Sequence, residues 1–340
     1  MHNAAHANSA AKPNRMTPRL GVVMDPIESI NAKKDTTLAL LLAAGARGWP
    51  IEYLPPAGLH LGAAGCRAIA TELRVRDDPG DWFSLGEPRD IALGELDVIL
   101  MRRDPPFDMD YIYATYLLEH AQAAGALVVN DPRGLRDFNE KMAATLFPQC
   151  CAPFLVAADA HRLRAFHAEH GDVVYKPLDG MGGTNIFRAR ADDPNLAVII
   201  ESLTAGGSRQ IMAQRFIPEI SAGDKRILLL DGEPVPFSLA RIPAAGETRG
   251  NLAAGGRGVC QELSERDRWI CREIGPSLAG RGMLFAGIDV IGDHLTEINV
   301  TSPTCLREIE RETGLDIAGE LMDCILAKLG RRDGYGKHKA

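Results

Sequence analysis

The sequence predicts an α/β protein with an N-terminal parallel-sheet domain, followed by a second unit built largely from antiparallel hairpins. In the first 130 or so residues, short apolar runs such as Leu20–Asp25 alternate with helical stretches such as Lys34–Arg47, which is typical of a parallel sheet. Beyond residue 139, β-type runs are joined by short glycine-containing turns instead. The chain has 340 residues, above the size at which a single core stops growing, so we expect two or three domains.

The N-terminal domain is expected to contain four strands and two helices. The expected strands are Leu20–Asp25, Ile51–Leu54, Leu96–Arg102 and Ala126–Asn130, and the expected helices are Lys34–Arg47 and Asp110–Ala124. No GxGxxG motif follows the first strand, so a dinucleotide site is not supported. Ligands of such sheets bind at the carboxyl ends of the strands, where Arg102 could hold a substrate carboxylate. The alternative to a substrate site at these strand ends is a set of ordinary loops that contain prolines.

Composition excludes several classes of function. The net charge is -7, with 45 acidic against 38 basic residues, which argues against nucleic acid as the main partner. No apolar run reaches the ~18–20 residues of a membrane span. Seven cysteines without a CxxC pair fit a reducing cytoplasm. We expect residues 1–18 to be a disordered extension and residues 331–340 a flexible tail.

A glycine-rich turn follows the expected strand Asp172–Lys176. The turn carries Gly180, Gly182 and Gly183 and leads into a second expected strand, Asn185–Ala189. A turn between two strands is not a P-loop. Its glycines nevertheless let backbone N–H groups approach phosphate oxygens closely, and Lys176 could contact them as a point charge. A plain β-hairpin remains the alternative.

Two further segments could flank the same phosphates. Ile211–Phe216 is an expected strand whose last residues could offer backbone groups to a base. Pro243–Gly258 has no secondary-structure signal, but it carries five glycines together with Arg249 and Arg257. Loops this long inside a compact domain are usually functional lids or disordered linkers. The spaced arginines suit an anion in a closed site, so we favour a lid.

An acidic hairpin lies between Phe285 and Val300. A three-residue turn at Gly292–His294 would place Asp289 opposite Glu297, and Gly287 opposite Asn299, all on one face. The other face then becomes nearly all apolar, whereas a two-residue turn would mix polar and apolar groups. Two carboxylates and an amide side by side suit Mg²⁺ shared with substrate phosphates. A solvated polar face is the alternative.

A helix start is expected directly after this hairpin. Ser302 is a good N-cap and Pro303 suits the first helical position. The free N–H groups of such a helix start attract anions. It would adjoin Asn299, so an anion site would lie next to the metal site.

Several long, collinear stretches together resemble one known family. They include VMDPIESINAKKDTT, VILMRRDPPFDMDYIYATYLLE, NEK, KPLDGMGG, DKRILLLDGEPVPFSLARIP, GETRGNLAAGGRG and DVIGDHLTEINVTSPTCLREIE, and they cover about Leu20 to Leu329. The chain resembles prokaryotic-type glutathione synthetases, which are ATP-grasp ligases. The resemblance implies an α/β fold of the α+β ATP-grasp type, with an N-terminal α/β substrate domain at 19–138. A two-lobed ATP-grasp unit follows, with a small lobe at 139–218 and a C-terminal lobe at 219–330 that carries a lid at 242–257.

The resemblance also implies an activity and a set of functional residues. The family joins γ-glutamylcysteine to glycine through an acyl phosphate, hydrolysing ATP to ADP and phosphate, with two Mg²⁺ (or Mn²⁺) ions; a cytoplasmic homotetramer is expected. The implied ATP-binding residues are Lys141, Lys176, Gly180, Gly182, Gly183, Gln214, Arg215, Phe216, Ile217 and Asp224. The implied metal ligands are Asp289, Glu297 and Asn299. The implied catalytic residues are Arg226, Arg249 and Arg257, and the implied substrate contacts are Arg102, Arg241, Asn299, Ser302, Pro303 and Thr304.

Two rival functions remain open at this point. Another ATP-grasp ligase would use the same nucleotide chemistry on a different carboxylate or amine. A non-catalytic ATP-binding regulatory protein is the rival from a different class. The presence of every implied metal ligand and of both lysines argues against that second rival.

Overall fold

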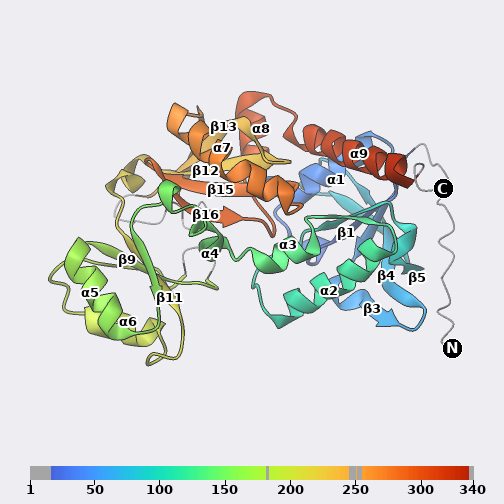
Figure 1. The fold of residues 1–340 in the computed structure, drawn as a ribbon. Helices are drawn as coiled ribbons and strands as arrows, with labels where there is room; N and C mark the ends of the chain where they lie inside the picture. Colours follow the sequence, from blue (N-terminus) through green and yellow to red (C-terminus); the bar gives the residue numbers. More distant parts are fainter. Residues whose placement is uncertain (1–16, 181–183, 245–249, 251–254, 337–340) are drawn as a thin grey trace.

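The computed structural model describes residues 17–180, 184–244, 250 and 255–336, with side chains up to residue 330. Figure 1 shows three parts, each built around one sheet. The strands are β1 Leu20–Val23, β2 Ile51–Leu54, β3 Leu59–Gly62, β4 Gly65–Val75, β5 Phe83–Ala92, β6 Val98–Met101, β7 Leu127–Val129, β8 Phe154–Ala157, β9 Val173–Pro177, β10 Phe187–Ala189, β11 Ile211–Arg215, β12 Asp224–Leu230, β13 Glu233–Ile242, β14 Arg257–Glu262, β15 Phe285–Ile291 and β16 His294–Asn299. The helices are α1 Thr36–Ala46, α2 Met109–Ala123, α3 Pro132–Asp137, α4 Glu140–Ala144, α5 Ala160–His170, α6 Leu196–Leu203, α7 Glu265–Gly280, α8 Leu306–Thr313 and α9 Ile317–Gly336.

The N-terminal sheet has the predicted parallel core. Strands β2, β1, β6 and β7 lie side by side and run parallel, with Leu20 opposite both Ile51 and Val98. All four residues of β1 are buried, as expected for a strand covered on both faces. Helix α1 begins after Asp35, whose carboxylate accepts the Leu38 N–H at 2.6 Å, so the expected helix is confirmed.

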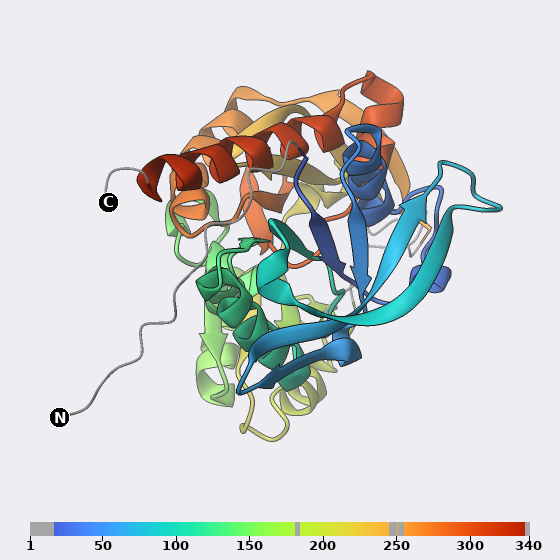
Figure 2. The same ribbon diagram turned by 90° about the vertical axis from the view of Figure 1, so that its right-hand side faces the viewer.

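The antiparallel extension of this sheet was not predicted. Strand β4 pairs with β2, and both β3 and β5 pair with β4. In Figure 2, β4 and β5 form a long, curved ribbon that projects from the domain. Most of β5 is exposed. Its sequence accordingly contains charged residues and has no apolar run. The sheet is therefore mixed rather than purely parallel.

The small lobe is a separate layer on the side of the molecule away from the N-terminal domain (Figure 1). Its sheet has the order β10-β9-β11-β8, and every pairing is antiparallel. Helices α5 and α6 cover one face of it (Figure 1). Their apolar side chains, among them Leu163 and Ile200, pack with Tyr175 of β9 into a core of their own. This core is distinct from those of the rest of the chain.

The C-terminal lobe contains the sheet β14-β13-β12-β15-β16. Between β12 and β13, Asp231 and Gly232 form a hairpin turn with positive φ values of 48° and 89°. Helix α7 starts after its N-cap Ser264, which forms a complete capping box with Asp267. Strand β14, which begins at Arg257, was not predicted.

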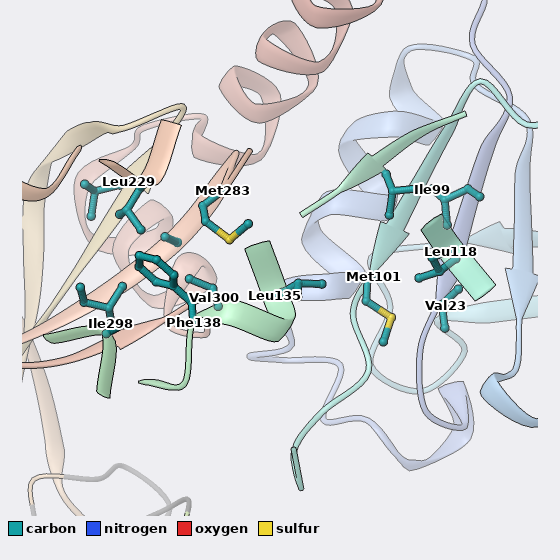
Figure 3. Close-up of a cluster of buried hydrophobic side chains, with 14 of the residues drawn as sticks. Val23, Ile99, Met101, Leu118, Leu135, Phe138, Leu229, Met283, Ile298 and Val300 are labelled. Atoms are coloured by element: carbon teal, nitrogen blue, oxygen red, sulfur yellow. The ribbon is translucent and has the colours of Figure 1, made fainter. Parts of the chain in front are cut away.

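One apolar core runs through both the N-terminal domain and the C-terminal lobe. Figure 3 shows Ile99 and Leu118 of the domain joined through Leu135 and Phe138 to Val300 of the lobe and its neighbours. A polar joint reinforces this contact. Buried Asn130, directly after β7, donates to the carbonyls of Phe285 and Val300 at 2.7 Å each and accepts the Phe285 N–H at 2.9 Å. These two parts therefore form one framework. Within the part of the chain that the structure describes, no helix is long and apolar enough to cross a membrane.

Candidate active site

A cavity of about 390 Å³ lies where the three parts of the chain meet. The predicted site residues that line it are Lys141, Lys176, Gly180, Gln214, Arg215, Phe216, Ile217, Asp224, Arg226, Arg241, Asp289, Glu297, Asn299, Ser302, Pro303 and Thr304. They come from segments more than 150 residues apart in the chain. The fold therefore brings most of the predicted set into one place.

The acidic hairpin has the predicted pairing but a different turn. Asp289 lies opposite Glu297, and Gly287 lies opposite Asn299, as expected. The three-residue turn is wrong, because Ile291 pairs with His294 and leaves a two-residue turn of Gly292 and Asp293. The register shift between Asp289 and Val290 leaves Thr296 as an extra residue on β16. This bulge restores the pairing that a two-residue turn would otherwise have broken.

The Asp289 carboxylate is the centre of a buried charge cluster. It accepts from Arg226 Nε at 2.5 Å and Nη2 at 3.0 Å, from Arg241 Nη2 at 3.0 Å and from Asn299 Nδ2 at 3.2 Å. Burial opposes its ionisation, but the two guanidinium groups outweigh burial and hold the pKa of Asp289 well below its ordinary value. Asp224 also pairs with Arg241. The site thus holds two arginines and two aspartates in one buried cluster.

Both predicted lysines are buried and point into the same cavity. Lys176 is 4% exposed, and its ammonium donates to two neutral oxygens, Gln214 Oε1 at 3.3 Å and Thr296 O at 3.4 Å. Burial lowers the pKa of Lys176. Lys141 donates to Gly180 O at 2.6 Å and lies 3.5 Å from Glu297 Oε1. An anion such as a phosphate would give Lys176 the charged partner that it lacks among these contacts.

Glu140 is a site residue that the sequence reasoning missed. It lines the cavity next to Lys141, with which it forms an ion pair. Burial and the charge of Glu297 raise the pKa of Glu140. Its position directly before the predicted lysine, in the segment Asn139-Glu140-Lys141, was the available signal. The charges of Glu297 and Asp289 thus both act on Glu140 at this end of the cavity.

The other end of the cavity is largely apolar. Val174, Ile186, Phe216, Ile217 and Ile291 contribute to its walls. Val174 lies on β9 and Ile291 ends β15, whereas Ile186 directly precedes β10 and Phe216 and Ile217 directly follow β11. A slot with apolar walls beside exposed strand-end backbone suits a flat heterocycle such as a base.

The predicted helix start at Ser302 and Pro303 is wrong. Helix α8 begins at Leu306, after Cys305, which has a positive φ of 81° and makes no side-chain cap. Ser302 Oγ donates instead to Asp104 Oδ1 at 2.5 Å, and Pro303 O accepts from Arg102 Nη2 at 3.1 Å. These contacts with the N-terminal domain hold the segment as a loop along the cavity wall. Local N-cap signals do not reveal such partners.

Arg102 lies behind the cavity rather than on its surface. Its side chain is 6% exposed; besides Pro303 O it bonds Thr37 Oγ1 at 3.0 Å, and its guanidinium lies 5.6 Å from the centre of the Phe285 ring. The neighbouring residues Asp104 and Pro105 line the cavity in its place. The carboxyl end of β6 thus reaches the site, as expected for such a sheet.

Several predicted residues lie elsewhere or outside the described residues. Gly182, Gly183 and Arg249, together with 245–248 and 251–254 of the predicted lid, are not described. Arg257 is exposed at the start of β14, opposite Ile242 of β13. A Cβ at Gly180 would come within 2.7 Å of Pro177, so this position of the glycine-rich turn accepts only glycine without rearrangement.

Comparison with known proteins decides the family. Two family models match: the prokaryotic glutathione synthetase N-terminal domain over residues 19–136 and the ATP-grasp domain of the same enzymes over residues 140–314. The chain is 62% identical to the glutathione synthetase of Pseudomonas putida over 93% of its own length and 100% of that protein. The chain belongs to the prokaryotic glutathione synthetase family. It is also 59% identical to the Xanthomonas campestris glutathione synthetase, covering 90% of this chain and 97% of that protein.

The fold of this glutathione synthetase family member also matches solved ATP-grasp structures. D-cycloserine synthetase DcsG gives a TM-score of 0.64 at 13% identity, covering 91% of this chain and 99% of that one. ATP-grasp ligase PsnB, complexed with a minimal precursor, gives 0.60 at 17% identity over the same shares. At such identities the likeness concerns the fold alone. It confirms the predicted α/β fold of the ATP-grasp type.

Proposed function

We propose that this chain joins γ-glutamylcysteine to glycine and hydrolyses ATP to ADP and phosphate, which makes glutathione. The observation that carries the proposal is 56–62% identity to glutathione synthetases over at least nine-tenths of both chains. The cavity supports it, since cationic, acidic and apolar regions adjoin there. In this division of labour, 19–138 is the substrate domain, 139–218 is the small lobe and 219–330 is the C-terminal lobe.

The nucleotide would lie between the small lobe and the acidic hairpin. Its base would enter the apolar slot beside Gln214 to Ile217, and Asp224 would hold the ribose. Its phosphates would meet Lys141, Lys176 and the glycine-rich turn that starts at Gly180. The burial of both ammonium groups supports this placement, because a desolvated cation attracts phosphate more strongly than one in water.

The acidic end of the cavity fits a divalent metal shared with ATP. The carboxylates of Glu140, Asp289 and Glu297 line the cavity there, and Asn299 adds a neutral oxygen. Among the described residues, no three His, Cys, Asp or Glu side chains suffice to hold a metal. Asp289, Glu297 and Asn299 would therefore hold it together with phosphate oxygens, as Mg²⁺ prefers. A bound divalent ion supplies neutralisation of charge on the transferring phosphoryl group.

The reaction would proceed through an acyl phosphate. A carboxylate is a poor electrophile, so the γ-phosphoryl group of ATP is first transferred to the carboxylate of γ-glutamylcysteine. The amine of glycine then attacks the carbonyl carbon, loses a proton, and phosphate leaves. Arg226 and Arg241 line the cavity next to Asp289 and would stabilise the charge of the transferring group. Arg249 and Arg257 remain predictions from the sequence.

The substrate peptide would lie along the loop from Asn299 to Thr304. Thr304 Oγ1 is already within 3.4 Å of Arg226 Nη1, so this loop and the catalytic arginine adjoin. Arg102 would act from behind by holding the Pro303 carbonyl in place. The tetramer and the cytoplasmic location likewise stay predictions.

One assay tests the proposal against its rivals. Purified protein is given Mg-ATP with γ-glutamylcysteine and, separately, glycine or D-alanine, and released phosphate and peptide product are measured. We expect stoichiometric phosphate and glutathione with glycine. Activity with other substrates alone would indicate another ATP-grasp ligase. ATP binding without any phosphate release would indicate a regulatory protein.

A further inference from the structure

An arginine outside the cavity packs against one of its walls. The guanidinium of Arg188, on β10, lies 3.4 Å from the centre of the Phe216 ring. Phe216 follows β11 and lines the apolar end of the cavity, whereas Arg188 is not part of that lining. A guanidinium over an aromatic face is attracted by the electrons of the ring. Arg188 thus supports Phe216 without lining the cavity itself.

Asp172 fixes both partners of this contact. Its carboxylate accepts from Arg188 Nε at 2.9 Å and from Arg188 Nη2 at 2.6 Å, the two-pronged geometry that orients a guanidinium most firmly. Its backbone carbonyl accepts the Phe216 N–H at 2.9 Å. Asp172 therefore holds the Arg188 guanidinium through its side chain. It holds the Phe216 main chain through its own carbonyl oxygen.

The same three residues connect the two segments that would hold the nucleotide. Arg188 lies opposite Val174 in the pairing of β9 with β10, and the glycine-rich turn joins these strands. Phe216 belongs to the segment that follows β11. Any displacement of the turn's second strand is thus transmitted to the wall of the apolar slot. The contact couples the phosphate end of the small lobe to the base end.

We propose that Arg188 and Asp172 are positioning residues for the nucleotide, which set the Phe216 ring before the base arrives. The proposal rests on the proposed function, since it takes the apolar slot as the adenine site. A wall fixed in advance loses less conformational entropy on binding. Without the contacts from Arg188 and Asp172, the Phe216 ring gains conformational freedom that the nucleotide must remove. Nucleotide binding therefore weakens, while the chemical step is unaffected.

Calorimetric titration with ADP tests the inference directly. For Arg188→Gln we expect ADP to bind about fivefold more weakly, within the range of a partly exposed cation–π contact. Arg190→Gln is the matched control. Arg190 is exposed two residues along the chain and also acts electrostatically on Asp172. Of these two arginines, it is Arg188 whose guanidinium lies over the Phe216 ring. The control should bind ADP as wild type does.

Steady-state kinetics separates positioning from a general structural role. Arg188→Gln should raise the KM for ATP about fivefold while kcat and the KM for glycine stay unchanged. Arg188→Lys keeps the charge but loses the planar face, so it should fall between wild type and the glutamine variant. It also decides the matter if Arg188→Gln does not fold.

The outcomes are distinguishable. If Arg188→Gln, Arg188→Lys and Arg190→Gln all bind ADP as tightly as wild type does, the positioning role is overturned and the proposed function stays intact. No ADP binding by wild type would overturn the nucleotide site and the inference with it. A parallel rise in the KM values for ATP and glycine would show a general structural defect and overturn the inference.

Discussion

Asp289 and Arg226 form a buried, two-pronged ion pair across adjacent strands. The two residues lie directly opposite each other in the pairing of β12 with β15, and their side chains are 5% and 7% exposed. Arg241, from β13, reaches the same carboxylate. Asp289 is therefore both a proposed metal ligand and the anchor of the two arginines that face the cavity.

Removing Arg226 should destabilise the fold as well as stop the reaction. Arg226→Met leaves the buried Asp289 carboxylate with Arg241 as its remaining cation. We expect the free energy of unfolding to fall by about 3 kcal/mol, the lower end for a broken buried pair. Urea unfolding measures this, with Arg257→Met, an exposed arginine of the same sheet, as the control. A loss no larger than that of the control would contradict the structural role of the pair.

Glu297→Gln should abolish turnover without unfolding the protein. The change removes one negative charge from the proposed metal site and keeps the shape of the side chain. We expect at least a hundredfold loss of phosphate release, in line with the loss of a positioned charge elsewhere, and an unchanged thermal midpoint. Glu262→Gln, an exposed glutamate on β14, is the control. Near wild-type activity at saturating Mg²⁺ would refute the metal assignment.

Oxygen transfer should reveal the acyl phosphate. If γ-glutamylcysteine carries ¹⁸O in the carboxylate that accepts glycine, one labelled oxygen should leave with the phosphate. Mass spectrometry of the released phosphate measures the label, with ¹⁸O water as the control for hydrolysis. Unlabelled phosphate from labelled peptide would rule out this route.

Proton uptake should accompany ATP binding at alkaline pH. Burial lowers the pKa of Lys176 below its ordinary value of 10.5 in the free protein, whereas bound phosphate favours the ammonium form and raises that pKa again. As pH rises through the pKa of the free protein, affinity for ATP therefore falls and binding takes up a proton. Titration calorimetry between about pH 8 and about pH 10, in two buffers of different ionisation enthalpy, measures this uptake.

A charge that does not titrate in this range supplies the control. Arginine keeps its proton up to about pH 12, so Lys176→Arg should bind ATP without the additional proton uptake. Equal uptake by wild type and Lys176→Arg would assign the proton to another group.

The parallel core and the shared acidic face could be predicted because both are local patterns. The core strands β1, β6 and β7 are apolar runs, and β1 is indeed fully buried. The pairing of Asp289 with Glu297 and of Gly287 with Asn299 follows from placing the polar residues on one side of the hairpin and the apolar residues on the other. The bulge at Thr296 was not predicted because the turn is one residue shorter than expected while β16 carries one extra residue. The two changes offset each other, so Asp289 still lies opposite Glu297.

The charged ribbon of β4 and β5 escaped prediction for a different reason. Its residues are mostly exposed on β5, so neither an apolar run nor a clean alternation marks the strand. Backbone pairing with β4 holds β5 in the sheet, and no local pattern in the sequence of β5 indicates this pairing. Sheet position, rather than local preference, determines such a strand.

The sequence by itself determined the family, the fold class and most residues of the cavity, because these depend on motifs that are contiguous along the chain. Only the tertiary structure decided how those residues are held. Pro303 is fixed as part of a loop by Arg102, 201 positions away, and Glu140 enters the acidic cluster through its nearness to Glu297. The support of Phe216 by Arg188 arises from strand pairing. Contacts between distant segments carry no period or spacing along the chain, so they appear only when the chain has folded.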